Sequence, residues 1–241
     1  MNVTSTTFEY SDGATTFEGV VARPAGSEAV RGGVLVAHAW GGCGAEEQRR
    51  AIMLAEMGYV AFAVDLYGKG IRGSSPEENA VLMQPMLDDR PRIAERMQLA
   101  LIELKKMEGV NSARTAAIGF CFGGLCVLDL ARSGADVAGV VSIHGLFLPP
   151  PVLADASITS SVLALHGWDD PLVPPEQVLA LATEMSAAKA DWQLHAYGNT
   201  LHAFTNPNAN DPDFGAVYDA DADRRSWAAA TEFLAERLQA G

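Results

Sequence analysis

Apolar residues along this chain gather in short continuous runs, and longer amphipathic stretches separate most of these runs. A continuous apolar run is typical of a strand that is covered on both faces. Runs of this kind predict strands at residues 33–38, 59–65, 114–119, 137–143, 161–166 and 192–197. Apolar residues at helical spacing predict helices at 46–57, 92–107, 123–133, 176–188 and 223–239. Because strands alternate with helices, the sequence predicts an α/β fold with a mostly parallel, doubly wound sheet.

The first residues differ from this pattern, because polar and apolar side chains alternate there. Residues 6–10 and 15–22 alternate in this way, and Ser11-Asp12-Gly13 lies between them. Such alternation on both sides of a turn sequence predicts an antiparallel hairpin, which we expect at an edge of the sheet. The chain shows no internal repeat and no low-complexity linker. Its 241 residues suit one α/β domain, so we expect a single domain over residues 1–241.

Two segments follow neither pattern. They span residues 68–89 and 200–221, and the second is rich in Asn, Asp and Pro. Each follows the carboxyl end of a predicted strand, which is the edge where open α/β sheets bind ligands. Long irregular segments in a compact domain are usually functional. We therefore expect both segments to be loops beside a binding site.

Charge and cysteine content narrow the possible partners and the compartment. Lys and Arg total 17 and Asp and Glu total 30, so the net charge is −13. An acidic surface repels nucleic-acid phosphates and anionic membranes, and we expect neither as a partner. The first residues carry no basic and apolar leader, and no apolar stretch approaches the ~18 residues of a membrane span. Three cysteines are too few for a disulfide framework, and these features together predict a cytoplasmic protein.

The most specific chemical motif lies between a predicted strand and a predicted helix, in Gly119-Phe120-Cys121-Phe122-Gly123-Gly124. This spacing is typical of a nucleophile elbow, in which the residues two before and two after the nucleophile must be very small. The thiol then lies at a helix N-terminus, where the helix dipole favours a thiolate. We expect Cys121 to be the nucleophile and the Phe122 N–H to be one oxyanion donor. The alternative is a buried cysteine beside a glycine-rich turn.

A thiol nucleophile needs a base, and the base needs an acid that orients it, in the chain order nucleophile, acid, histidine. Asp170 follows the predicted strand 161–166, and its Gly-x-x-Asp spacing favours it over Asp169, which we expect to be solvated or capping. His202 follows the last predicted strand, on a segment that can fold back over the sheet edge. We therefore expect Asp170 and His202 to complete a triad with Cys121.

The other histidines have weaker context. His195 lies inside a predicted strand and His166 ends one, which is typical of core histidines. His144 and His38 also end strands, but at the expected active edge, so each stays a candidate for the pocket.

The other cysteines suggest packing rather than chemistry. Cys126 falls on the helix after the elbow, whereas Cys43 lies in a glycine-rich turn that is a candidate for the pocket mouth. No His or Cys spacing matches a metal site, and no glycine-rich stretch has the spacing of a nucleotide-binding loop. We expect no metal and no cofactor.

The turn after the first predicted parallel strand forms the second part of the expected site. In enzymes with a nucleophile elbow this turn supplies the second oxyanion donor. We expect the backbone N–H of Ala39 in that role, with Trp40 as the adjacent alternative. We expect His38, Trp40 and Phe204 to line the substrate pocket.

Together these residues resemble the dienelactone hydrolase family of α/β-hydrolases over essentially the whole chain. The resemblance rests on residues 119–124, His166-Gly167-x-x-Asp170-Pro171-x-Val173-Pro174, His202-Ala203-Phe204, Val64-Asp65-Leu66-Tyr67-Gly68 and Tyr218 with Arg224-Arg225-Ser226-Trp227. It implies an α/β-hydrolase fold without a cofactor. It also implies that Cys121 is the nucleophile, His202 the base and Asp170 its partner.

Two positions depart from the family pattern. Type members carry a Glu in the first oxyanion loop that engages the resting thiol, where this chain has Ala37-His38-Ala39-Trp40. They also carry an Arg four residues after the catalytic histidine, which grips a substrate carboxylate, where this chain has Asn206. Arg90 and Arg92, beside the segment 68–89, are candidates to replace that grip. The length and the departures are also similar to a metagenome-derived member of the family that is described as a phosphotriesterase.

The sequence thus predicts a hydrolase that cleaves small neutral esters or lactones through an acyl-enzyme on Cys121, with phosphotriesters as further substrates. A hydrolase scaffold without catalytic activity, which binds a ligand or a partner, is the alternative from another class.

Overall fold

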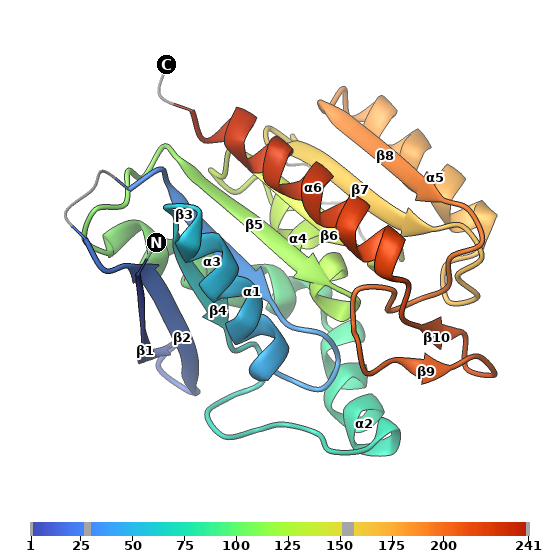
Figure 1. Cartoon of the computed structure of the whole chain (residues 1–241), viewed down its shortest axis with the longest axis horizontal. Coiled ribbons are helices and arrows are strands. Elements are labelled where there is room, and N and C mark those ends of the chain that lie inside the picture. Colours follow the sequence, from blue (N-terminus) through green and yellow to red (C-terminus); the bar gives the residue numbers. More distant parts are fainter. Residues whose placement is uncertain (1, 27–29, 151–156, 240–241) are drawn as a thin grey trace.

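One large sheet organises the part of the chain that the computed structural model describes, residues 2–26, 30–150 and 157–239. Its eight strands lie in the order β1-β2-β4-β3-β5-β6-β7-β8, and β9 pairs with β10 in a separate small sheet (Figure 1). The strands are β1 Val3–Ser11, β2 Thr16–Pro24, β3 Gly33–Ala37, β4 Val60–Val64, β5 Thr115–Phe120, β6 Gly139–Ile143, β7 Ser161–Gly167, β8 Trp192–Tyr197, β9 Asn210–Asp211 and β10 Ala216–Val217. The strands from β4 to β8 in this order pair in parallel, which confirms the predicted mostly parallel α/β sheet.

The helices cover both faces of this sheet. They are α1 Ala45–Glu56, α2 Pro76–Leu87, α3 Arg90–Lys106, α4 Phe122–Arg132, α5 Pro175–Ala187 and α6 Ala220–Arg237. In Figure 1, α1 and α6 cross the front of the sheet, and α3 and α4 lie behind it. Every residue of β3 is buried. Leu35 packs into the core that α3, α4 and α5 share, whereas Val34 and Val36 pack with α1 and α6, so continuous apolar runs serve two cores.

The N-terminal hairpin forms as the alternating pattern predicts. Strand β1 pairs with β2 in antiparallel register and forms one edge of the sheet, and β2 joins β4, also antiparallel. Strand β8 forms the other edge, and its residues are half-buried or exposed. The prediction that this strand is covered on both faces is therefore wrong.

The segment 68–89 contains a helix, so the expectation of an irregular loop there is wrong. Helix α2 starts after Ser75, whose hydroxyl accepts the Glu78 N–H at 3.3 Å, and Pro76 occupies its first turn. Both residues are ordinary start signals. Met86 is the one residue of α2 that is buried, so the helix has no apolar stripe along its length. Pro85 lies inside the helix, near its end. Residues 200–221 are largely irregular, as expected, apart from the short strands β9 and β10 and the start of α6 at Ala220.

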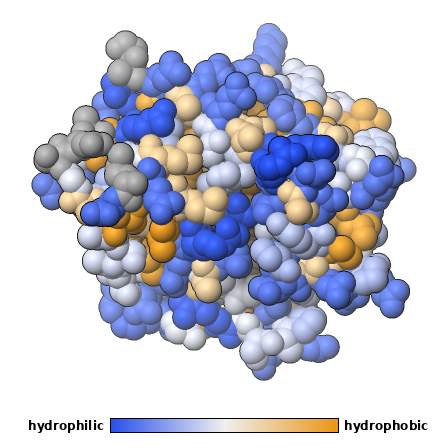
Figure 2. Space-filling view, viewed as in Figure 1, coloured by the Kyte–Doolittle hydropathy of each residue, from blue (hydrophilic) through white to orange (hydrophobic). Residues whose placement is uncertain are grey.

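The outer surface is polar on the face that Figure 2 displays, where apolar residues appear in small groups among hydrophilic ones. No helix in residues 2–26, 30–150 and 157–239 is long and apolar enough to cross a membrane.

Candidate active site

A tight turn between β5 and α4 places Cys121 at the N-terminus of the helix. Its backbone has φ 54° and ψ −116°, which side chains other than glycine rarely adopt. A Cβ at Gly119 would lie 2.0 Å from the Gly123 carbonyl oxygen, and one at Gly123 would lie 2.3 Å from the Ala37 oxygen. Glycine at both positions therefore allows the start of helix α4 to pack closely against the ends of β5 and β3, as the elbow motif predicts.

The carboxylate of Asp170 and the imidazole of His202 form a buried pair. The distance from His202 Nδ1 to Asp170 Oδ2 is 2.7 Å, and the other oxygen of Asp170 accepts the Leu172 N–H at 2.8 Å. Nδ1 is thus the protonated donor, because an ionised carboxylate can only accept. The Nε2 atom of His202 is buried and has no hydrogen-bond partner among the described residues. Asp169 is exposed, so the geometry favours Asp170 as the acid.

The electrostatics of the site favour a charged His202. Burial disfavours the imidazolium, but the Cys121 sulfur and the hydrogen bond to Asp170 outweigh it and raise the pKa of His202 from 6.5 to about 10. The position of His202 between the Asp170 carboxylate and the Cys121 sulfur thus favours the imidazolium form.

A cavity of about 960 Å³ opens over these groups and connects the loops at the carboxyl edge of the sheet. Cys121, His202, Ala39 and Trp40 all line it, as the sequence predicts. Its wall also contains residues from α1, α2 and the segment after β8, among them Glu46, Glu47, Arg50, Asn79, Asn206 and Phe214. Phe214 stacks on Trp40 with ring centroids 5.8 Å apart, so an aromatic pair joins the two sides of the cavity.

The first oxyanion loop differs from the expectation in one detail. The N–H of Ala39 donates to Glu47 Oε1 at 3.2 Å, and Glu47 Oε2 also accepts the Gly44 N–H at 2.9 Å. Glu47 belongs to the first turn of α1, where such a contact caps the helix. The N–H groups of Trp40 and Phe122 have no acceptor among the described residues. The free donors are therefore Phe122 and the alternative, Trp40.

The structure places two expected pocket residues behind the cavity wall rather than on it. His38 is fully buried, donates from Nδ1 to the Ala39 carbonyl at 2.6 Å and accepts the Leu66 N–H at Nε2. Phe204 is also fully buried, with its ring edge against His144. Both side chains are enclosed by the protein rather than exposed to the cavity, a direction that sequence position alone does not reveal.

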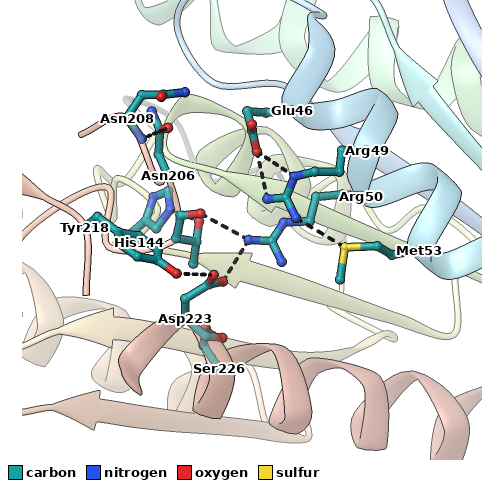
Figure 3. Close-up of polar contacts among 11 residues, drawn as sticks. Glu46, Arg49, Arg50, Met53, His144, Asn206, Asn208, Tyr218, Asp223 and Ser226 are labelled. Atoms are coloured by element: carbon teal, nitrogen blue, oxygen red, sulfur yellow. Dashed lines mark hydrogen bonds and ion pairs between the residues drawn. The ribbon is translucent and has the colours of Figure 1, made fainter. Parts of the chain in front are cut away.

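Arg90 and Arg92 also lie away from the cavity. Arg90 forms a buried ion pair with Asp129 at 2.6 Å, and Arg92 pairs with Asp89 on the surface. The cavity contains instead Arg50, which reaches it from α1 and pairs with Asp223 of α6 at 2.8 Å (Figure 3). No sequence signal identified Arg50 or Glu47, because both belong to a helix whose amphipathic pattern predicted packing alone.

The remaining thiols are buried and lie outside the cavity wall. Burial raises the pKa of Cys43 to about 12, and burial raises that of Cys126 well above its ordinary value. Neither is a candidate nucleophile. The described ranges contain no group of three or more His, Cys, Asp or Glu residues with metal-binding geometry.

A mostly parallel sheet, a tight strand–turn–helix elbow and an Asp–His pair at the same edge are typical of the α/β-hydrolase fold. An α/β-hydrolase from a deep-sea metagenome has the same fold, with a TM-score of 0.65 at 17% identity over 97% of this chain and 98% of that one. The model of the dienelactone hydrolase family matches residues 17–238. The chain belongs to that family, as its motifs predict, and it is an ester-hydrolysing enzyme.

Two relatives are more similar in sequence. A dienelactone hydrolase-like promiscuous phosphotriesterase from metagenomic libraries superposes with a TM-score of 0.92 at 38% identity over 98% of both chains. An uncharacterized protein of Caenorhabditis elegans is 37% identical over 155 residues, which are 62% of this chain and 96% of that protein. Membership of an enzyme family disfavours the alternative of a scaffold without catalytic activity.

The raised pKa of His202 predicts a pH-dependent contribution to stability. A folded-state pKa of about 10 against an ordinary value of 6.5 means that the stabilisation is complete below about pH 6.5 and is lost as the pH rises through 10. Urea unfolding should therefore show that His202→Gln loses more stability relative to wild type at neutral pH than near pH 10. His195→Gln, on the exposed side of β8, is the matched control and should show no such trend. A deficit for His202→Gln that is constant or grows with pH contradicts the charged pair.

Proposed function

We propose that the enzyme hydrolyses small neutral carboxylic esters or lactones through a thioester on Cys121. The observation that supports this most is the common cavity, in which Cys121 at the strained elbow meets the His202–Asp170 pair. A thiolate beside an imidazolium is a competent nucleophile at neutral pH.

In the first half of the reaction the Cys121 sulfur attacks the substrate carbonyl carbon, and the carbonyl oxygen becomes an oxyanion. The N–H groups of Phe122 and Trp40 stabilise this charge, because both are free to donate. The Ala39 N–H can serve only if the Glu47 carboxylate leaves it. Collapse of the intermediate expels the alcohol, which takes the proton from His202 Nε2.

In the second half His202 acts as a base. Its neutral Nε2 removes a proton from water, the hydroxide attacks the thioester, and the acid product leaves as the Cys121 thiolate re-forms. The imidazolium is then restored beside the thiolate. Asp170 accepts the Nδ1 hydrogen bond throughout and keeps Nε2 directed at the cavity.

The charges in the cavity wall favour a neutral substrate. Arg50 is already paired with Asp223, and Glu46 is paired with Arg49 at 2.8 Å. Asn206 is uncharged and lines the wall at the position where the family type members carry an Arg. Arg72 also lines the wall, but its Nε donates to the Cys43 carbonyl oxygen, and the Glu47 carboxylate in the same wall opposes an anionic substrate.

We propose phosphotriester hydrolysis as a second activity of the same site. Its support is the 38% identity over 98% of both chains with the promiscuous phosphotriesterase. A triester carries no net charge, and its P=O oxygen gains negative charge on attack, so the same amides can stabilise it.

We also propose a reducing compartment, the cytoplasm, because Cys43, Cys121 and Cys126 are all free thiols.

Loss of one triad member should remove most turnover of a neutral aryl ester. Cys121→Ala and His202→Ala should each lower kcat at least about a thousandfold, and Asp170→Asn somewhat less, because these groups act as one unit. Asp169→Asn, at the exposed neighbouring carboxylate, is the matched control and should keep kcat within about twofold. Near-normal kcat in Cys121→Ala refutes the proposed nucleophile.

Substrate charge should affect kcat/KM strongly. A neutral aryl ester or lactone should exceed a carboxylate-bearing dienelactone by about tenfold or more, because position 206 holds the uncharged Asn206 and the Glu47 carboxylate lines the same cavity. Asn206→Arg should narrow this difference by supplying the cation. If wild-type enzyme prefers the dienelactone, the proposal of neutral substrates is wrong.

A diethyl aryl phosphate separates turnover from inhibition. Attack by Cys121 on phosphorus expels aryloxide and leaves an S-phosphoryl enzyme, which water must then hydrolyse with His202 as the base. We expect sustained release of many equivalents of aryl alcohol. A single stoichiometric burst, or no release in a preparation that cleaves aryl esters, contradicts phosphotriester turnover.

A further inference from the structure

The imidazole of His144 contacts the backbone of Cys121. His144 follows β6 directly, at φ 36°, and is almost fully buried. Its Nδ1 accepts the Cys121 N–H at 3.1 Å, and the same N–H also reaches the Ile143 carbonyl at 3.1 Å. On its other side, His144 Nε2 lies 2.8 Å from the Thr205 hydroxyl. A ring that accepts at Nδ1 carries its proton on Nε2, so the contacts define a neutral tautomer.

We propose that His144 is a positioning residue, which fixes the backbone of Cys121 through Nδ1 and ties it through Nε2 to the loop that carries His202. The inference rests on the proposed role of Cys121 as nucleophile. It adds a residue that acts through Cys121 and the His202 loop rather than on the substrate itself.

The contact between His144 and Thr205 is continued by further polar contacts. Thr205 lies three residues after His202, and its carbonyl accepts a hydrogen bond from Arg50 Nη2 at 3.1 Å. Arg50 also pairs with Asp223 at 2.8 Å, and the Tyr218 hydroxyl lies 3.4 Å from Asp223. Figure 3 shows this continuous set of contacts from His144 to helix α6. The loop with His202 is therefore held against two helices and against the nucleophile turn.

The surroundings of His144 keep it neutral. Burial lowers its pKa well below the ordinary value, and the His202 and Arg50 charges lower it further. The two imidazoles lie 5.2 Å apart between ring centroids, one neutral and one with a raised pKa. Protonation of His144 would remove the lone pair that accepts the Cys121 N–H, so its neutrality preserves the contact.

Such a contact matters because the nucleophile turn is strained. Cys121 has φ 54° and ψ −116°, and the peptide that follows it carries the Phe122 N–H. A hydrogen bond that holds the Cys121 amide therefore fixes both the direction of the thiol and the position of one oxyanion donor. A displacement of about 1 Å in such groups can lower the rate about a hundredfold.

Two substitutions of His144 distinguish the contact that Nδ1 makes with Cys121 from the contact that Nε2 makes with Thr205. In His144→Asn the amide oxygen can replace Nδ1 as acceptor, whereas in His144→Gln the longer side chain can replace Nε2 and leaves the Cys121 N–H to Ile143. We expect His144→Gln to lower kcat for an aryl ester about tenfold or more below His144→Asn, with little change in KM. Rates are expressed per Cys121 that iodoacetamide can alkylate, below the melting temperature of both variants.

The pair Thr205→Ser and Thr205→Val tests the other contact without change at His144. Thr205→Ser keeps the hydroxyl and should retain kcat, while Thr205→Val should lose it several-fold. His195→Gln, away from the cavity, controls for loss of a histidine and should keep wild-type kcat.

Equal kcat in His144→Asn and His144→Gln, or equal kcat in the two Thr205 variants, overturns the inference and leaves His144 a structural histidine. That outcome differs from failure of the proposed function, in which Cys121→Ala itself keeps turnover.

Discussion

The close approach of helix α4 to the ends of β3 and β5 determines the geometry of the whole site. Only hydrogen at Gly119 and Gly123 permits it, since a Cβ at either position would collide with backbone at 2.0 to 2.3 Å. The helix N-terminus then begins directly behind the strand end, and Cys121 is forced into a strained conformation at that point. The thiol, the free Phe122 N–H and the helix dipole consequently share one small volume above the sheet edge.

The second constraint is the burial of charge beside this turn. His202 has a raised pKa because it lies between Cys121 and Asp170, although burial alone would keep it neutral. His144, whose ring centroid is only 5.2 Å away, has a lowered pKa because burial disfavours its charged form and the His202 charge lowers the pKa further. Two imidazoles with opposite protonation preferences thus lie side by side, and the contacts of each match its state.

The sequence predicted the parts of the molecule that depend on local patterns. Continuous apolar runs located the parallel strands, the alternating N-terminal residues located the hairpin, and the elbow spacing identified the Cys121 turn. The order of Asp170 and His202 behind strand ends was enough to bring them together, because parallel strands end at the same edge. These patterns did not predict helix α2, because the helix buries so few residues that its sequence shows no apolar residues at helical spacing.

The missed parts of the site depend on long-range geometry. His38 and Phe204 occupy the expected loops, but their side chains turn into the core. Glu47 and Arg50 reach the site from a helix, and Arg50 contacts residues more than 150 positions away in the chain. Their roles follow from the distance between α1, α6 and the His202 loop, which no local pattern encodes.

The most direct test of the account is to identify the atom that carries the acyl group during turnover. An aryl ester reacted with the Asp170→Asn variant, quenched in acid within the first turnover and digested, should yield one peptide with the mass of the acyl group on Cys121. Wild-type enzyme should show the same adduct at lower occupancy, and Cys121→Ala should show none. Ester turnover without any acyl-cysteine peptide, or an adduct on another residue, would contradict the account.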